Sequence, residues 1–244
     1  MKSIILWLFI AIGPCLALAQ TKVSKSYPVT KGQTIDLRFD YPKIIKLSTW
    51  EGSELVIEAT VKINNGESNN AFSLKENITG DKISISNKLD MDAIPNSYYI
   101  VDQGIKTRFN SKNDMDAYVA QKGSGSRISY YSTQDIEITI NIKVPVGVST
   151  DVLSTYGMVE VQNFKAPISV KATYGGVDAS VTEAAIGKLQ LTTRYGRIFS
   201  NLSLKPTEQT QKDFFTSITA TPGSGPSYDL SSSYGNIYLR SSIK

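Results

Sequence analysis

The fold is decided by a ten-residue pattern that occurs four times in the second half of the chain: VLSTYGMVEV (residues 152–161), VKATYGGVDA (170–179), LTTRYGRIFS (191–200) and LSSSYGNIYL (230–239). The tyrosines follow one another after 18, 21 and 39 residues. The third interval is close to twice the others, so it either skips one degenerate unit or contains an inserted loop. A period near 20 residues is typical of a chain that builds one structural unit per repeat.

Parity within the pattern gives a reason for the glycine. Relative to the tyrosine, an apolar residue stands at −4 and a small residue at −2, whereas the apolar or small residues after the glycine stand at +3 and +5. We therefore expect the strand to bend or bulge at the glycine, which tolerates positive φ. Each unit is then strand, corner and strand, and its defining residues are Tyr156, Gly157, Tyr174, Gly175, Tyr195, Gly196, Tyr234 and Gly235.

The rest of the chain also alternates like β-strands. Residues 55–63 are apolar at every odd position, and residues 135–145 carry isoleucine or valine at every second position. Strands with one buried and one solvated face have this pattern, so the chain from Gln20 onward is predicted to be all-β. Two polar stretches, residues 90–132 and 205–228, are expected to be long loops.

Stacking of the units would bury a shared interior and pair their strands in parallel, about 4.8 Å apart. The sequence therefore predicts that residues 20–244 form a single-stranded parallel β-helix, a β-solenoid, with two long polar loop excursions. The four tyrosines would then form a ladder. We favour rings that stack to seal the corner; the alternative is an exposed aromatic stripe that binds sugar rings.

The N-terminus has the parts of an export signal. Lys2 gives a positive start, residues 4–12 are continuously apolar, and residues 17–19 form a small-x-small cleavage site. We therefore expect residues 1–19 to be a signal peptide and the mature chain to reside in the periplasm or at the cell surface. The alternative is lipidation of Cys15, although Pro14 stands where a small residue is usual. No later stretch is long and apolar enough for a transmembrane helix.

Composition excludes several classes of chemistry. The chain has no histidine and one cysteine, which falls in the expected signal peptide. The mature part therefore lacks the side chains of a Ser-His-Asp triad or a His/Cys zinc site. The 26 basic and 22 acidic residues of the full chain give a net charge of +4, which is no footprint for nucleic acid. We expect no catalytic residues, no metal and no cofactor.

The acidic residues offer one further possibility. Three pairs are separated by a single residue: Asp135 and Glu137, Asp90 and Asp92, Asp114 and Asp116. The first pair is expected to be solvated on a strand face, and the other two lack the ligand spacing of a calcium loop. The stretch 123–126 (GSGS) lacks the lysine of a phosphate-binding loop and is expected to be a flexible turn. Two carboxylates that meet only in space would still suffice for a glycosidase.

Three stretches carry a family resemblance. They are residues 144–147 (VPVG) with the first Tyr-Gly unit, residues 44–52 (IIKLSTWEG), and the strand that follows at 55–63. Together they resemble a bacterial family of putative adhesins, which are exported domains of unknown function with a right-handed β-helix fold. The resemblance covers most of the mature chain and implies a right-handed fold. It brings no catalytic residue and no cofactor.

These observations predict an exported, non-enzymatic module that acts in adhesion, binding or envelope structure. Its ligand would be a carbohydrate or a protein, bound by the loops or by a lateral strand face. The alternative is a carbohydrate-active enzyme, which a cleft lined by close acidic pairs would favour. Because solenoid ends expose unpaired strands, we also expect the C-terminal edge, at residues 241–244, to be shielded by a loop or used for self-association.

Overall fold

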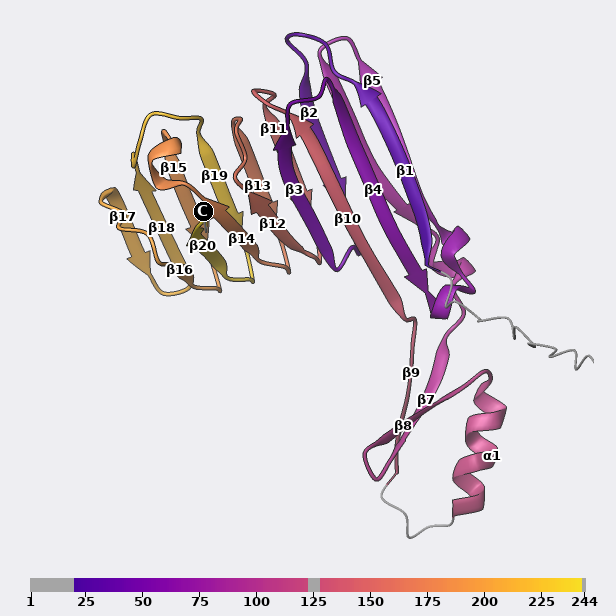
Figure 1. Ribbon diagram of the computed structural model, residues 1–244. Helices are drawn as coiled ribbons and strands as arrows, with labels where there is room; N and C mark the ends of the chain where they lie inside the picture. The colour runs from indigo at the N-terminus through magenta and orange to yellow at the C-terminus, as the bar shows by residue number, and fades with distance from the viewer. Residues whose placement is uncertain (1–19, 123–127, 243–244) are drawn as a thin grey trace, which may run out of the picture.

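Figure 1 shows the computed structural model, which describes residues 20–122 and 128–242. The predicted signal peptide, Cys15 and the predicted turn at 123–126 lie outside the described residues. Within them, strands form two large sheets and one small sheet, accompanied by one α-helix and short 3-10 helices. The chain is thus mostly β, as the alternation predicts.

The first large sheet, here sheet A, has eight strands. Their order in space is β1 (Thr21–Pro28), β4 (Glu54–Ile63), β10 (Ile136–Pro145), β3 (Ile44–Trp50), β12 (Met158–Gln162), β14 (Val177–Val181), β20 (Ile237–Ser241) and β16 (Ile198–Ser200). The strands β1, β4 and β10 pair antiparallel, whereas all pairs from β10 to β16 are parallel. Sheet A is therefore mixed.

The second large sheet, sheet B, has nine strands. Their order is β17 (Pro206–Lys212), β18 (Phe215–Ala220), β15 (Leu189–Thr193), β19 (Tyr228–Ser232), β13 (Ile168–Ala172), β11 (Thr150–Ser154), β2 (Thr34–Phe39), β6 (Lys82–Leu89) and β5 (Phe72–Thr79). Pairs from β15 to β6 are parallel, and the pairs at both ends are antiparallel. Sheet B is mixed as well.

One hydrophobic core joins the inward faces of both sheets. The alternating pattern explains which side chains enter it. In β10, Ile138, Ile140 and Ile142 are buried while Glu137 is exposed, and β4 alternates in the same way. Such close-packed interiors hold a scaffold rigid, which fixes the outward side chains in place.

The prediction of a single-stranded right-handed parallel β-helix is wrong. Both large sheets contain antiparallel strands, and their strand order does not follow the order of the chain. The physical reason is that a period of two specifies the faces of a strand but neither its partner nor its direction. Parallel and antiparallel neighbours therefore cannot be told apart by alternation alone.

The last two strands show the departure most clearly. In Figure 1, β19 lies between β13 and β15, and β20 lies between β14 and β16, although both strands come after all four in sequence. The expectation of a C-terminal edge is therefore also wrong, because the final strand is internal. The outer strands at this end of the sheets are β16 and β17.

The two polar stretches are not long loops. The first contains β7 (Ser97–Asp102), β8 (Ile105–Phe109), helix α1 (Lys112–Lys122) and β9 (Ile128–Thr133), and the three strands form a separate antiparallel sheet that projects from the body (Figure 1). The second contains the β17–β18 hairpin, which pairs with β15. Short 3-10 helices lie at Asn64–Gly66, Asn69–Ala71, Met91–Ala93 and Glu183–Ala185.

Candidate binding surfaces

The four repeat tyrosines stack into a ladder, but in a different order from the chain. The ring centroids of Tyr156 and Tyr174 are 5.3 Å apart, those of Tyr174 and Tyr234 5.1 Å, and those of Tyr234 and Tyr195 5.0 Å. Interplanar angles of 6–12° make these rings nearly parallel. Tyr234 thus separates Tyr174 from Tyr195, because β19 and β20 lie between the neighbouring strands.

A fifth tyrosine, which sequence reasoning missed, extends the ladder. The ring of Tyr41 stacks on Tyr156 at 5.5 Å. The signal was present but incomplete, since Leu37 stands at −4 while proline replaces the glycine after Tyr41. At the other end Phe214, from the β17–β18 turn, packs on Tyr195 at 5.4 Å. The ladder is therefore a continuous aromatic row of six rings.

Backbone hydrogen bonds fix the spacing of the rings. The amide of Tyr174 donates to the Thr155 carbonyl at 2.8 Å, and the amide of Tyr234 donates to the Thr173 carbonyl at 2.9 Å. The small residues at −2 lie in the core, where the Ser232 hydroxyl donates to the Gly175 carbonyl at 2.8 Å. Each tyrosine thus lies on the turn between the two strands of its unit, and hydrogen bonds join this turn to that of the neighbouring unit.

The glycine after each tyrosine is needed for a different reason from the one we expected. None of the four has positive φ. Instead, a Cβ on Gly175 would lie 1.9 Å from the Gly157 carbonyl oxygen, and one on Gly196 would lie 1.9 Å from that of Gly235. The backbones of successive turns therefore approach too closely for any side chain.

The ladder remains open to solvent. Tyr156, Tyr174, Tyr195 and Tyr234 are 53–57% exposed, and Phe214 is 71% exposed. Because the faces of neighbouring rings lie against one another, the edges and hydroxyl groups carry much of this exposure. The rings stack, as the first interpretation requires, but they do not remove the corner from water. Exposed contiguous apolar surface of this kind marks interaction sites in other proteins.

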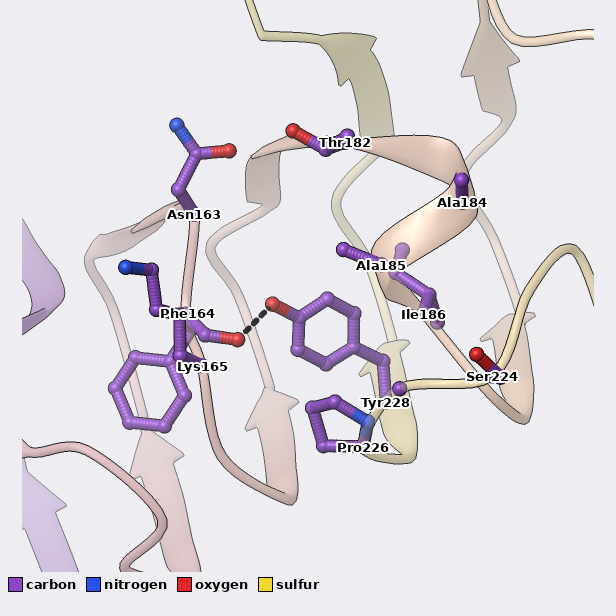
Figure 2. A pocket seen from close by; sticks show the side chains of 11 residues that line it. Asn163, Phe164, Lys165, Thr182, Ala184, Ala185, Ile186, Ser224, Pro226 and Tyr228 are labelled. Atoms are coloured by element: carbon purple, nitrogen blue, oxygen red, sulfur yellow. Dashed lines mark hydrogen bonds between the residues drawn. The ribbon is translucent and has the colours of Figure 1, made fainter.

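A cleft of about 510 Å³ lies elsewhere on the same body (Figure 2). The residues that line it include Tyr228, Phe164, Ile186 and Pro226, the first three of which are almost fully buried, and Lys165 lies beside them. The Tyr228 hydroxyl donates a hydrogen bond to the Phe164 carbonyl. Burial raises the pKa of Tyr228 to about 12. The cleft has the size and the mixture of apolar and polar groups that suit a small ligand.

A third surface is a charged trough on the outer face of sheet B, of about 360 Å³. It contains the carboxylates of Asp36 and Asp151, which stand at paired positions of β2 and β11. Asp36 is held by the Arg38 guanidinium at 3.1 Å and by the Lys82 ammonium at 3.2 Å. Both carboxylates thus line one depression, and sequence reasoning does not single them out.

The acidic pairs noted in the sequence have other roles. The Asp135 carboxylate accepts a hydrogen bond from Tyr99, whose pKa is raised by burial and further by this carboxylate. Glu137 lies 3.8 Å from Lys62. Asp114 belongs to the first turn of α1, where its amide donates to the Ser111 hydroxyl at 3.1 Å. Asp135 is thus not simply solvated, and Asp114 is not a loop residue.

Asp90 and Asp92 lie just before and within the 3-10 helix Met91–Ala93, and Asp116 lies in α1. In the part of the chain that the structure describes, no three acidic, histidine or cysteine side chains gather as a metal site would require. None of its helices has the length and hydropathy to cross a membrane.

No family model matches the sequence, and no curated protein is similar to it. Among solved structures, the chain is similar to a putative cell adhesion protein from Clostridium sporogenes, with 9% identity and a TM-score of 0.48 over 91% of this chain and all of that one. It is also similar to a putative adhesin from Bacteroides fragilis, with 12% identity and a TM-score of 0.26 over 91% of this chain and 98% of that one. Its structural neighbours thus carry adhesion names.

Proposed function

We propose that the chain is an exported, non-enzymatic binding module of the adhesin-like or envelope-structural type, with the tyrosine ladder as its contact surface. One observation carries this proposal: a continuous row of exposed aromatic rings is fixed by backbone hydrogen bonds to a close-packed core. Because the rings are already ordered, a ligand would immobilise few side chains on binding, which lowers the entropic cost.

The chemistry of the ladder suits a ligand that is partly apolar and rich in hydrogen-bonding groups. Ring edges supply apolar contact, and each tyrosine adds a hydroxyl that can donate or accept. Carbohydrates and protein surfaces both meet this description. The N-terminal sequence, which resembles a signal peptide, supports an encounter with such ligands outside the cytoplasm.

A matched pair of variants tests the role of the ladder. Fluorescently labelled mature chain is titrated onto isolated cell envelopes, and the double variant Tyr174→Ser/Tyr234→Ser is compared with Tyr130→Ser. Tyr130 is somewhat more accessible, at 63% exposure against 56% and 53% for Tyr174 and Tyr234, but lies on β9 outside the ladder. We expect the double variant to bind at least about tenfold more weakly, since aromatic contacts contribute about 1 kcal/mol or more each. Equal binding by both variants would refute the proposal.

Treatment of the envelopes then separates the two ligand classes. If the ligand is a carbohydrate, periodate oxidation should abolish binding while proteolysis leaves it intact. The opposite result identifies a protein ligand. Binding that survives both treatments would show that the labelled chain adheres nonspecifically.

The charged trough supports a second candidate, a carbohydrate-active enzyme. Asp36 and Asp151 face one depression, and paired carboxylates are the catalytic groups of most glycosidases. Asp36 is tied to two cations, which leaves Asp151 as the more available acid. The test is release of reducing ends from soluble polysaccharides by the mature chain. Asp213, an exposed residue in the β17–β18 turn outside the trough, serves as the control. Turnover that disappears in Asp151→Asn and persists in Asp213→Asn would establish this candidate against the binding module.

A further inference from the structure

The C-terminal segment 228–241 fills a position between strands that all precede it in the chain. Its first strand, β19, pairs with β13 on one side and β15 on the other, and its second strand, β20, pairs with β14 and β16. All four flanking strands precede the segment in the chain. Until the segment is in place, therefore, each sheet has a gap one strand wide, with two unpaired edges facing each other.

The neighbouring repeat units on both sides form backbone hydrogen bonds with the segment. On one side the Tyr234 amide donates to the Thr173 carbonyl, and on the other the Tyr195 amide donates to the Ser233 carbonyl at 2.8 Å. Leu230, Ile237 and Leu239 have no exposed surface and complete the core, to which Tyr228 also belongs. The segment is thus held by main-chain pairing and apolar packing, which any identical segment would reproduce.

The linker, residues 221–227, connects β18 to the segment. It runs tightly against the 3-10 helix at Glu183–Ala185. A Cβ on Gly225 would lie 1.8 Å from the Ala185 carbonyl oxygen, and one on Gly223 would lie 2.1 Å from that of Ala184. If a second chain supplied the segment, the strand pairing would be the same. Only the path of the linker would differ.

We propose that the partner of this gap is a second copy of the chain, whose segment 228–241 inserts between β13/β14 and β15/β16 in place of the molecule's own. This inference goes beyond the proposed binding function. Two molecules that exchange segments form a closed dimer. Molecules that each donate to the next are joined by heterologous contacts, which give a ring where the rotation closes and an open head-to-tail assembly where it does not.

Two single-cysteine versions of the mature chain test the proposal, since residues 20–244 contain no other cysteine. Lys171 and Ser231 are register partners on β13 and β19. Lys171→Cys and Ser231→Cys proteins of different size are unfolded together and refolded under mild oxidation at increasing concentration. We expect the mixed disulfide to increase with concentration, because it forms when β19 of one molecule lies beside β13 of the other.

A mixture of Lys171→Cys and Thr192→Cys proteins is the background control. Thr192 is the partner of Ser231 on its other side, but Lys171 and Thr192 both lie outside the exchanged segment. Exchange therefore never brings residue 171 of one molecule beside residue 192 of the other. Adding Gly225→Ala to the Ser231→Cys protein should raise the mixed disulfide severalfold, because the new methyl group displaces the linker from its closed path. Gly80→Ala, with open space around it, should leave the yield unchanged.

The proposal is overturned if both proteins refold, as circular dichroism reports, and the mixed disulfide stays at the background of the control at every concentration. It is also overturned if Gly225→Ala and Gly80→Ala give equal yields. Light scattering of the cysteine-free chain after the same refolding distinguishes closed dimers from longer assemblies.

Discussion

The close approach of successive turns can be tested by adding one methyl group. In Gly175→Ala the new Cβ would lie 1.9 Å from the Gly157 carbonyl oxygen and 2.5 Å from its carbon. Favourable contacts between such atoms begin near 3.5 Å, so the two turns must separate by more than about 1 Å. This movement strains two backbone hydrogen bonds. One is donated by the Tyr174 amide to the Thr155 carbonyl, and the other by the Val159 amide to the Gly176 carbonyl.

The expected cost follows from these contacts. Overpacking costs about 1–3 kcal/mol, and each weakened hydrogen bond adds up to about 1 kcal/mol. Gly175→Ala should therefore destabilise the protein by about 3 kcal/mol or more. For a chain of this length that lowers Tm by roughly 10 °C. Stacking of Tyr156 on Tyr174 should loosen as well, because both rings are attached to the turns that separate.

The assay is urea and thermal unfolding of the mature chain, followed by circular dichroism. Gly80→Ala is the matched control, because a Cβ there meets nothing within 4 Å and its φ lies outside the left-handed region. It should change the free energy of unfolding by less than about 0.5 kcal/mol. Equal stability of the two variants would show that the turns are not packed as described.

Three further predictions concern single side chains. Because burial raises the pKa of Tyr228 from 10.0 to about 12, its contribution to stability is complete below pH 10 and is lost as the pH rises towards 12. In Tyr228→Phe, the free energy of unfolding should decrease less steeply with pH between about 10 and 12. At pH 7 this variant should be about 1 kcal/mol less stable, because it lacks the hydrogen bond to the Phe164 carbonyl. Burial also raises the pKa of Asp229 on β19, so the charge of this carboxylate opposes folding at neutral pH. In urea unfolding at pH 7, Asp229→Asn should therefore be more stable than the parent protein. The difference should vanish at acidic pH, where Asp229 is protonated in both the folded and the unfolded state. Ser111→Ala removes the hydroxyl that accepts from the Asp114 amide, and hydrogen exchange in α1 should accelerate by an amount equivalent to about 1 kcal/mol while the large sheets are unaffected.

The sequence predicts the strands well where one face is buried. The alternation in residues 55–63 and 135–145 corresponds to β4 and β10, and each Tyr-Gly pattern spans the end of one strand and the start of the next. Local periodicity suffices here because burial of one face is a property of each strand by itself. The same periodicity contains no information on pairing, which is why the parallel stack in chain order was wrong.

The polar stretches were missed for a second reason. The β17–β18 hairpin has one wholly exposed strand, so no alternation marks it. Helix α1 buries Met115 alone and has no apolar stripe, and its best signal was the Ser111 and Asp114 pair, which has the spacing of a capping box. The 39-residue interval between Tyr195 and Tyr234 contained this hairpin, an insertion that the spacing alone left open.

The ladder was partly predictable and its purpose was not. Equivalent positions in successive units indicated that the tyrosines lie near one another, but the order Tyr174, Tyr234, Tyr195 depends on where the last strands insert. The change of parity predicts a glycine with positive φ, whereas the structure shows that carbonyl groups of a neighbouring turn leave no room for a Cβ. Contacts between distant segments cannot be derived from the residues of one unit.

Disulfide trapping within a single chain tests the strand order most directly. Lys171 and Ser231 are register partners on adjacent strands, whereas Lys171 and Thr192 lie on strands with β19 between them, roughly 10 Å apart. The pair Lys171→Cys/Ser231→Cys should therefore oxidise rapidly within the folded monomer, and the pair Lys171→Cys/Thr192→Cys should remain reduced. Rapid oxidation of the second pair with none of the first would mean that the units follow chain order and that the C-terminal strands do not lie inside the sheets.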